Sequence, residues 1–365
     1  MTEIHSTMLS LDVLRVERTL LVIALLFIIV IAVKMTSYLI SLFLMSLIIT
    51  LLGVPALFWL KKKGLPNLVA VLLITLVACS LIFVFVALTT LSFQTLLADL
   101  PQYQQELNTR LADVSAFIAS LGLSSSASNT LSFDLEQVFA NLGQVISMGV
   151  AGAKSIVDGL MFLFFVGVTS FFMLLEAPKI ATRLEERFGK DSDTIQQFSR
   201  MTGYIIDFIV VRTETNAVHG LLFGGFLATM GVHAAVLWGL LTFLLGYIPY
   251  FGLVIAAIPA IFFAWLQFGV PGAVAVIAAV CVLNLVVENP VYSWLAARKF
   301  EVPALIVIVS VIFWGWLLGL VGMLFSIPFT LIVLLIIQLS DDLRWINGFI
   351  GVGHLFEEKE GKKEG

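Results

Sequence analysis

Residues 215–287 read TNAVHGLLFGGFLATMGVHAAVLWGLLTFLLGYIPYFGLVIAAIPAIFFAWLQFGVPGAVAVIAAVCVLNLVV, without a single Asp, Glu, Lys or Arg. Gly and Pro interrupt this stretch at residues 246–252 (GYIPYFG), at Pro259 and at Pro271-Gly272. Because soluble domains do not hold so long an apolar stretch, it predicts a chain in a bilayer. Irregular backbone at membrane depth is tolerated only where it is buried in protein or lines a water-filled cavity. The breaks therefore indicate a pathway for something that crosses the membrane.

The composition of the whole chain predicts an all-α, polytopic membrane protein. Hydrophobic residues make up 60% and charged residues 12%, against about 25% charged in soluble domains. The apolar runs are continuous, whereas the strands of a membrane β-barrel alternate apolar and polar residues. The net charge is −4 with no basic face, so we expect no nucleic-acid partner.

The sequence offers no sign of a cofactor, a metal site or an enzyme. Cys79 and Cys281 lie within apolar runs, without metal-ligand or disulfide spacing, and are expected to be buried small hydrophobic residues. A phosphate-binding loop, an H-E-x-x-H motif and a G-x-S-x-G motif are all missing from the sequence. We therefore expect a protein that neither hydrolyses ATP nor catalyses hydrolysis.

Four transmembrane spans are predicted in the first half. Residues 19–60 hold one charge, Lys34, and fit two helices that turn near residues 34–37. Residues 64–98 predict a third span and residues 159–175 a fourth. Residues 1–91 then form an N-terminal unit of three spans, and residues 155–213 hold the fourth span and a cytoplasmic amphipathic helix.

The charges near these spans predict a cytoplasmic N-terminus. Basic residues in short loops mark the cytoplasmic side, and they cluster before residue 19, at residues 61–63 and at residues 179–200. Residues 92–154 carry more acidic than basic side chains and are expected outside. Strict alternation of four spans agrees with each assignment.

The external segment, residues 92–154, is predicted to be a small helical hairpin. Its apolar residues follow helical spacing from Leu100 to Leu121 and again from Leu135 to Ile146, with a Ser-rich turn at residues 124–130. The two apolar stripes either pack only on each other or pack on neighbouring subunits as well.

Residues 214–340 are predicted to form a broken-helix core, followed by a cytoplasmic tail at residues 341–365. The charged, Gly-bearing end of this tail, residues 357–365, is expected to be disordered. Three crossings within residues 215–287 would place Arg298 and Lys299 outside, against the charge rule. Two crossings with a re-entrant element keep both inside, and the Gly and Pro breaks favour this version. Residues 302–340 form either a pair of crossings or a second hairpin.

Polar residues at the start of this core are candidate proton-coupling groups: Asp207, Arg212, Glu214, Asn216 and His219. On a helix, Asp207 and Glu214 share one face, while Arg212, Asn216 and His219 share another. Either these residues mark the cytoplasmic water boundary, with Arg212 snorkelling, or Glu214 and His219 carry protons at the inner mouth of a pathway.

The end of the long apolar run holds the candidate pathway residues. Asn284 and Glu288 lie one helical turn apart, and Asn289 follows. Glu288 is either an interfacial anchor, or partner of Arg298, or a group that contacts the solute or a coupling ion. Pro249, Tyr250 and Gly252 are expected to form or hinge the same pathway.

Closely spaced glycines predict tight helix packing. Gly220 and Gly224 have the small-xxx-small spacing that lets helix backbones approach, as do Gly315 and Gly319, with Gly322 nearby. His233, beside a bend expected at Gly231, is interpreted as a boundary residue.

The second half resembles the autoinducer-2 exporter family of bacterial membrane proteins. The resemblance rests on the break at residues 246–252, on Glu288-Asn289 with Arg298 and Pro303 downstream, and on residues 312–329 (IFWGWLLGLVGMLFSIPF). The chain departs from the family at Ser293, where a proline is common.

This resemblance implies efflux of a small solute such as autoinducer-2 across a bacterial inner membrane by a homo-oligomer, a pentamer. We therefore expect a secondary exporter whose site alternates between the two sides of the membrane. The alternatives are a sodium or lithium/proton antiporter, whose partner would be a monovalent cation, and an oligomeric channel or scaffold.

Overall fold

The structure is a computed structural model, and it describes residues 20–120 apart from 22, 23 and 26, then 153–189, 192–249, 251–288, 290, 303–340, 343 and 345–352. Within these ranges the regular elements are helices, and no strand occurs among them. Among the described residues, four helical segments are long and apolar enough, by length and composition, to cross a membrane: Ser37–Lys62, Asn67–Leu96, Gly159–Phe188 and Gly252–Glu288, the last of which is interrupted at Gly269. The predicted class, an all-α polytopic membrane protein, is confirmed.

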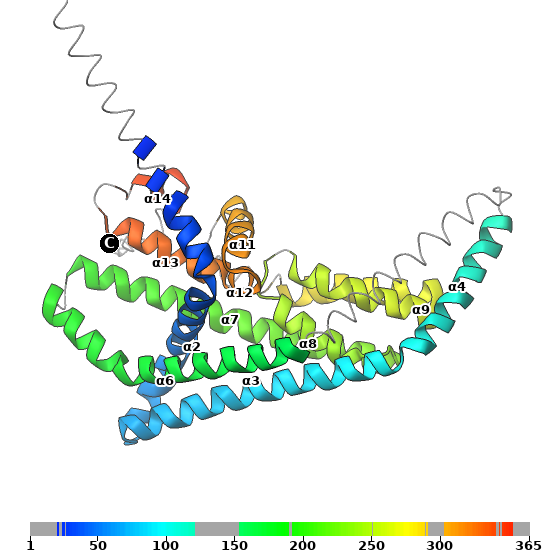
Figure 1. Cartoon of the computed structure of the whole chain (residues 1–365), viewed down its shortest axis with the longest axis horizontal. Helices are drawn as coiled ribbons and strands as arrows, with labels where there is room; N and C mark the ends of the chain where they lie inside the picture. Colours follow the sequence, from blue (N-terminus) through cyan, green and yellow to red (C-terminus); the bar gives the residue numbers. More distant parts are fainter. Residues whose placement is uncertain are drawn as a thin grey trace, which may run out of the picture.

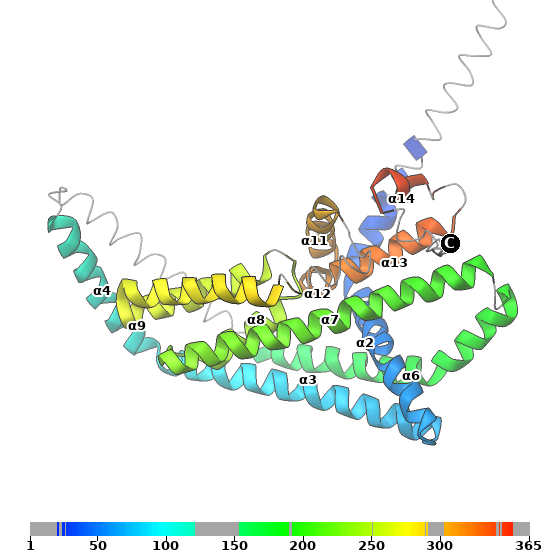
Figure 2. The same cartoon turned by 180° about the vertical axis from the view of Figure 1, so that it is seen from behind.

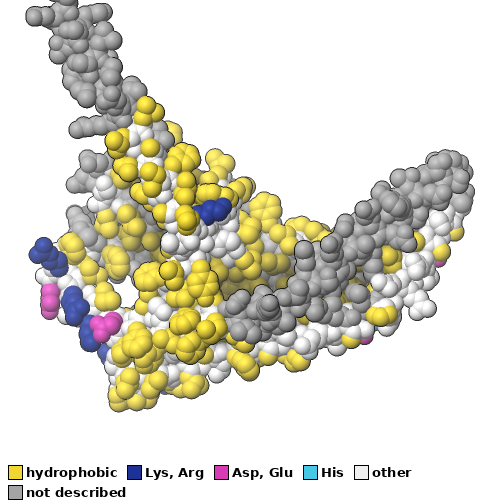
Figure 3. Space-filling model, in the orientation of Figure 1, with side chains coloured by type: hydrophobic (Ala, Val, Ile, Leu, Met, Phe, Trp, Pro, Cys, Tyr) yellow, Lys and Arg dark blue, Asp and Glu magenta, His cyan; other side chains and the backbone are white. Residues whose placement is uncertain are grey.

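The helices follow one another as shown in Figure 1. In chain order they are α2 (Ser37–Lys62), α3 (Asn67–Ala98), α4 (Leu100–Ser120), α6 (Ala153–Phe188), α7 (Asp193–Met230), α8 (Ala235–Leu245), α9 (Gly252–Leu283), the π-helical η1 (Asn284–Glu288), α11 (Ala304–Leu318), α12 (Leu320–Leu324), α13 (Ser326–Gln338) and α14 (Trp345–Phe349). Figure 3 shows hydrophobic side chains over much of the visible surface, with charged side chains gathered near the turn between α6 and α7.

The N-terminal helices pack through small and polar residues. Gly53 on α2 lies against Leu174 on α6, and a Cβ at this glycine would come within 3.0 Å of the leucine side chain. Ser46 and Ser170 connect the same helices, because the Ser170 hydroxyl donates to the Ser46 carbonyl at 3.1 Å. Interhelical hydrogen bonds and small residues are the usual means of helix association in lipid.

The chain bends at Thr36 instead of reversing there, which differs from the antiparallel pair expected around residues 34–37. Backbone hydrogen bonds continue on both sides, from Thr36 N–H to Ala32 and from Ile40 N–H to Thr36, at 3.0 and 3.1 Å. The Thr36 hydroxyl also donates to the Ala32 carbonyl at 2.8 Å. Such back-bonding bends a helix without ending it, and residues 34–37 include neither Gly nor Pro. Figures 1 and 2 show the preceding segment running on into α2.

Helix α7 crosses the boundary expected at residue 213 and links two hydrophobic clusters. It begins after Ser192, whose side chain accepts a hydrogen bond from the Ile195 N–H, and it ends at Gly231 in the left-handed conformation. Its first half packs with α2, α11, α12 and α13 in one cluster. Its second half packs with α3, α8 and α9, and α4 completes this second cluster.

Two helical hairpins make up the centre of the molecule. In the first, the 220–245 hairpin, α8 folds back on the end of α7, and Gly220 and Gly224 lie against Gly239. A Cβ at Gly220 would come 2.6 Å from the Gly239 carbonyl oxygen, so this approach requires glycine. Figures 1 and 2 show α7, α8 and α9 side by side, with α4 crossing one end of α9.

The second is the 252–288 hairpin, in which α9 is interrupted at Gly269. The φ of Gly269 is 68°, a left-handed conformation. A Cβ at Gly272 would come 2.5 Å from the Ala264 carbonyl oxygen, so the chain after Gly269 turns back along residues 252–268. Each half is about 25 Å long at about 1.5 Å per residue, less than the roughly 30 Å of a bilayer core. The predicted break in this part of the core is therefore present, at Gly269.

A further hairpin of short helices follows at residues 304–338, the second of the two alternatives expected there. Gly319, with a φ of 66°, separates α11 from α12. The Trp314 indole N–H donates to the Thr330 hydroxyl at 2.9 Å, which itself lies 2.8 Å from the Ser310 hydroxyl and connects α11 to α13. The disordered end of the tail expected at residues 357–365 and the second stripe of the external hairpin lie outside the described residues.

Candidate functional site

The two central hairpins contact each other at both of their ends, which lie on opposite sides of the core. We call one end the base: residues 212–219 of α7, the break at residues 246–252, and η1. The other end is the tip: the turns at residues 231–234 and 267–270. The tips touch through a hydrogen bond from the His233 N–H to the Gln267 side-chain oxygen, at 3.2 Å. The base holds most of the candidate residues.

An ion pair joins the two hairpins at the base. One Arg212 nitrogen, Nη1, lies 3.0 and 3.1 Å from the two oxygens of Glu288. Arg212 is only 4% exposed, so it does not snorkel toward water as one expectation had it. Burying two charges costs more than their attraction returns unless the geometry is good and other partners are present. A pair held at such cost within apolar helices is a functional candidate.

Two further polar side chains lie on the same face of α7. Asn216 is 0% exposed and His219 is 3% exposed. Among the residues that the structure describes, three of their side-chain atoms have no hydrogen-bond partner: the amide nitrogen and oxygen of Asn216 and the Nε2 of His219. Buried polar atoms normally have partners, so an unmatched amide suggests that a water, ion or solute completes it. The Arg212, Asn216 and His219 side chains share the face that helical spacing predicts.

The break in the chain closes over this face. Asn216 lies against Gly246, where a Cβ would come 2.5 Å from the amide oxygen. The Tyr247 hydroxyl lies 2.6 Å from the Thr213 hydroxyl, which fixes the break to α7. Pro249 is buried, and a Cβ at Gly252 would overlap the Leu245 carbonyl. Glycine at both ends therefore lets the break pack tightly against the cluster.

Other predicted residues lie elsewhere. Glu214 is exposed, Asp207 is half-buried on the same side of α7, and neither shares the face of His219. Asn284 is exposed at the start of η1, whereas Glu288 at its end is partly buried against Arg212. Tyr250, Asn289 and Arg298 lie outside the described residues. The structure thus groups Arg212, Asn216, His219 and Glu288, and separates Glu214 from His219.

Sequence reasoning missed two contacts of the base. Gly246 was noted only as part of the break, although it touches Asn216. Thr213 was not singled out, although it holds Tyr247. Position offered a signal for both, since Gly246 opens the break and Thr213 adjoins Arg212. Among the described residues, no cluster of His, Cys, Asp and Glu could hold a metal ion.

The predicted packing glycines near the C-terminus lie within the 304–338 hairpin. A Cβ at Gly315 would come 2.6 Å from the Met323 side chain, and one at Gly322 would overlap the Trp314 carbonyl. Gly319 has open space around its Cβ position but a positive φ of 66°. These glycines therefore shape the turn between α11 and α13, while Gly220 and Gly224 hold α7 to α8.

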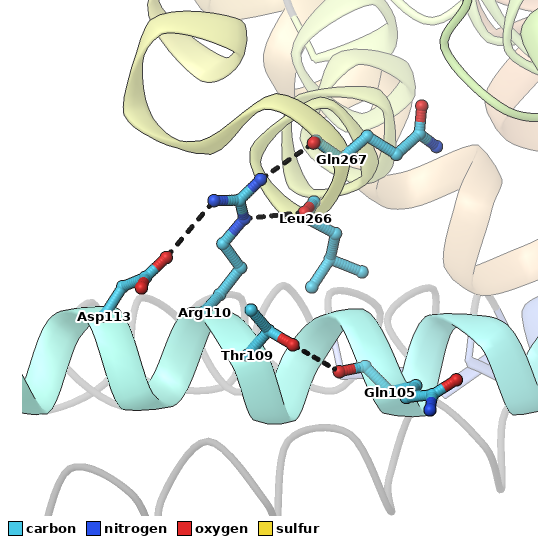
Figure 4. A network of polar contacts seen from close by, with 6 residues as sticks. All are labelled: Gln105, Thr109, Arg110, Asp113, Leu266 and Gln267. Carbon is cyan, nitrogen blue, oxygen red and sulfur yellow. Dashed lines mark hydrogen bonds and ion pairs between the residues drawn. The ribbon is translucent and has the colours of Figure 1, made fainter.

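At the tip, the arm α4 lies across both hairpins. The Arg110 Nε and Nη2 donate to the carbonyls of Leu266 and Gln267, each at 2.8 Å (Figure 4). Tyr103 packs edge-on against Phe263, with ring centres 4.8 Å apart. Burial raises the pKa of Tyr103 to about 12, with Asp99 and Glu106 adding to the shift, so the phenol stays neutral at physiological pH.

Comparison with known proteins agrees with this architecture. The sequence model of the AI-2E family of transporters matches residues 20–341. The "AI-2 transport protein TqsA" of Escherichia coli K12 is 27% identical over 317 residues, covering 87% of this chain and 90% of the relative. A candidate transport protein of Haemophilus influenzae is 28% identical over 336 residues, covering 90% and 94% of the two chains.

A candidate transport protein of E. coli K12, YhhT, is 27% identical over 277 residues and covers 76% of this chain and 77% of the relative. The family match spans the broken core, the base cluster and the arm α4. With several apolar helices, the chain is a multi-pass membrane transporter. It belongs to the AI-2E transporter family.

Proposed function

We propose that this transporter exports a small solute by secondary transport, and that the base of the central hairpins is its binding site. The observation that carries the proposal is the group of buried Arg212, Asn216 and His219 with partly buried Glu288 beside a break in the chain. A solute with hydroxyl or carbonyl groups would complete the unmatched atoms of Asn216 and His219. The amide offers both donors and an acceptor, and the ion pair supplies charge to orient the solute.

In the proposed mechanism, the site opens alternately to the two sides of the membrane. The break at residues 246–252 and the π-helical turn η1 are the flexible connections beside the site. When the two hairpins separate at the base, Arg212 and Glu288 part and water enters. When they close, the ion pair re-forms around the bound solute. The driving force is an ion gradient or the gradient of the solute itself.

Autoinducer-2 is the proposed solute, and release of this molecule would serve quorum sensing. The similarity to TqsA, whose name gives autoinducer-2 as its cargo, supports this choice. We further propose an inner-membrane location with the N-terminus in the cytoplasm, on the basis of the basic residues at positions 61–63 and 179–200. A homo-oligomer, a pentamer, would cover apolar side chains of α3 such as Leu76 and Phe83, which are exposed in the single chain.

The second candidate function is antiport of sodium or lithium against protons. It is favoured by one observation, the presence of a carboxylate and an imidazole in one buried cluster. Glu288 would then exchange a proton for the cation, with the amide oxygen of Asn216 as a further ligand. Acidified vesicles with a pH-sensitive dye inside separate the two functions, because antiport raises the internal pH on addition of sodium or lithium without autoinducer-2.

Glu288→Gln tests the proposed site directly, with Glu214→Gln as a matched control. Both changes remove one carboxylate, but only Glu288 faces Arg212. We expect efflux of autoinducer-2 from vesicles to fall at least tenfold in Glu288→Gln, about the effect of losing one charge-assisted hydrogen bond, and to stay near wild type in Glu214→Gln. Equal efflux in the two variants would remove Glu288 from the site. Linear, unsaturable flux would indicate a channel, and no flux a scaffold.

A further inference from the structure

Arg110 holds the arm α4 to a helix end that lacks its own donors. The carbonyls of Leu266 and Gln267 belong to the last turn before the break at Gly269, where helical N–H donors run out. The residue four positions after Gln267 is Pro271, which has no N–H at all. The guanidinium therefore replaces the missing donors, at the negative end of the helix dipole (Figure 4).

The same guanidinium has a second partner on its own helix. Arg110 Nη1 lies 3.3 Å from the Asp113 carboxylate, one turn further along α4. A Cβ at Gly269 would lie 3.4 Å from this nitrogen, so Asp113 and the turn of the 252–288 hairpin flank a single group. If α4 moves away from the hairpin, Arg110 keeps its ion pair with Asp113 and is not left as an unpaired charge. The contact can therefore break and re-form at low cost.

The contact between α4 and the hairpin tips, which we call the joint, leaves some buried polar atoms without hydrogen bonds when it is closed. Among the described residues, four buried polar atoms have no hydrogen-bond partner: Tyr103 Oη, Glu106 Oε2, His233 Nδ1 and Gln267 Nε2. Each such atom disfavours the closed joint, because water would satisfy it on opening. The two carbonyl contacts and the packing of Tyr103 on Phe263 favour the closed joint. These opposed contributions are what a two-state element requires.

We propose that Arg110, with the Leu266 and Gln267 carbonyls, forms a latch that closes the tip of the transport core. Release of the latch moves α4 away and opens the tip to water while the base stays closed by Arg212 and Glu288. Arg110 acts as a positioning residue, since it holds the hairpin and lies at the opposite end from the proposed solute site. The role of the latch in transport rests on the proposed function; its opening and closing do not.

A cross-link tests whether the tip must open. In a background with Cys79→Ala and Cys281→Ala, we would place Asp113→Cys and Val270→Cys, both at exposed positions, and join them with a short, reductively cleavable thiol reagent in proteoliposomes. We expect the reagent to abolish autoinducer-2 transport and its cleavage to restore it, each relative to the untreated double-cysteine protein, while the reagent leaves the Asp113→Cys single variant at its own untreated rate. Unchanged transport by the cross-linked protein, or failure to cross-link, would overturn the latch.

Thiol labelling provides a test that needs no transport. Leu266 is 1% exposed beneath α4, so Leu266→Cys should react slowly with a maleimide supplied on both sides of the membrane. Adding Arg110→Ala should speed the reaction roughly tenfold, because two charge-assisted hydrogen bonds are lost, and Arg110→Lys should retain part of the protection. Equal rates in all three proteins would overturn the latch. Protection by Arg110 in a protein that moves no solute would instead refute the proposed function alone.

Discussion

The base and the tip of the central hairpins differ in how their polar groups are paired within an apolar core. At the base, the structure buries a complete ion pair, Arg212 with Glu288, beside an amide whose atoms have no partner in the described chain. At the tip, a charge from outside the hairpins, Arg110, supplies donors to backbone carbonyls. The base therefore has the unpartnered polar atoms of a ligand-binding site, whereas the tip is held by a side chain from α4 that can dissociate.

Arg212→Ala should have the largest effect and act at the base. It leaves the partly buried Glu288 without its cation, a change that costs up to about 3–5 kcal/mol. We expect a large drop in the melting temperature of the detergent-solubilised protein together with loss of efflux. The double variant Arg212→Met, Glu288→Leu should recover the melting temperature but not efflux. Recovery of both would show that the pair serves packing only.

Arg110→Ala should have the next largest effect and act at the tip. A hydrogen bond from a charged group contributes about 1.5–3 kcal/mol, so losing both costs roughly 3–6 kcal/mol while the joint stays closed. Because water then satisfies the polar atoms of the opened joint, part of this cost returns, and we expect a smaller drop in melting temperature than for Arg212→Ala. A drop as large as that of Arg212→Ala would contradict the contrast between the two ends.

Gly220→Ala tests the body of the hairpin between the two ends. The new methyl group would meet the Gly239 carbonyl at 2.6 Å and push α8 from α7, at a cost of about 1–2 kcal/mol. Gly225→Ala is the control, since nothing lies within 4 Å of its Cβ position. We expect a lower melting temperature for the first variant only. Equal values for both would mean that α7 and α8 are not held by this contact.

Asn216→Ala should have the smallest effect on stability and the clearest separation of stability from function. The amide has no partner in the described chain, so its removal should change the free energy of unfolding by roughly 1 kcal/mol or less. Efflux should nevertheless fall, with a higher KM for the solute. A variant that unfolds readily would indicate that Asn216 is a structural residue and would weaken the site proposal.

Several features of the base could be predicted from sequence because they follow from local spacing. Arg212, Asn216 and His219 lie four and three residues apart, which places them on one helical face. The break at residues 246–252 is visible as Gly and Pro within an apolar run. The partner of Glu288 could not be predicted, since Arg212 is 76 residues away and is brought near by the reversal at Gly269.

The tip and the N-terminal bend show why other features escape sequence reasoning. Arg110 binds backbone carbonyls, which every residue has, so its partners leave no mark in the sequence; only Pro271 hints that a carbonyl lacks its donor. Lys34 suggested a turn because charges usually end membrane helices. In the structure its ammonium instead lies 3.9 Å from the centre of the Trp316 ring, and the helix continues with a bend.

Helix α7 has a mechanical consequence for any moving part of this molecule. Its hydrogen-bonded ladder runs from Asp193 to Met230 with no proline, and it belongs to both hydrophobic clusters. Because the helix is rigid, a tilt of α7 at one hydrophobic cluster moves the residues of the other cluster as well. Any rotation of the hairpins must then occur at the chain breaks beside α7, at residues 246–252 and 284–288. Substitutions that stiffen either break should slow turnover while leaving solute affinity unchanged.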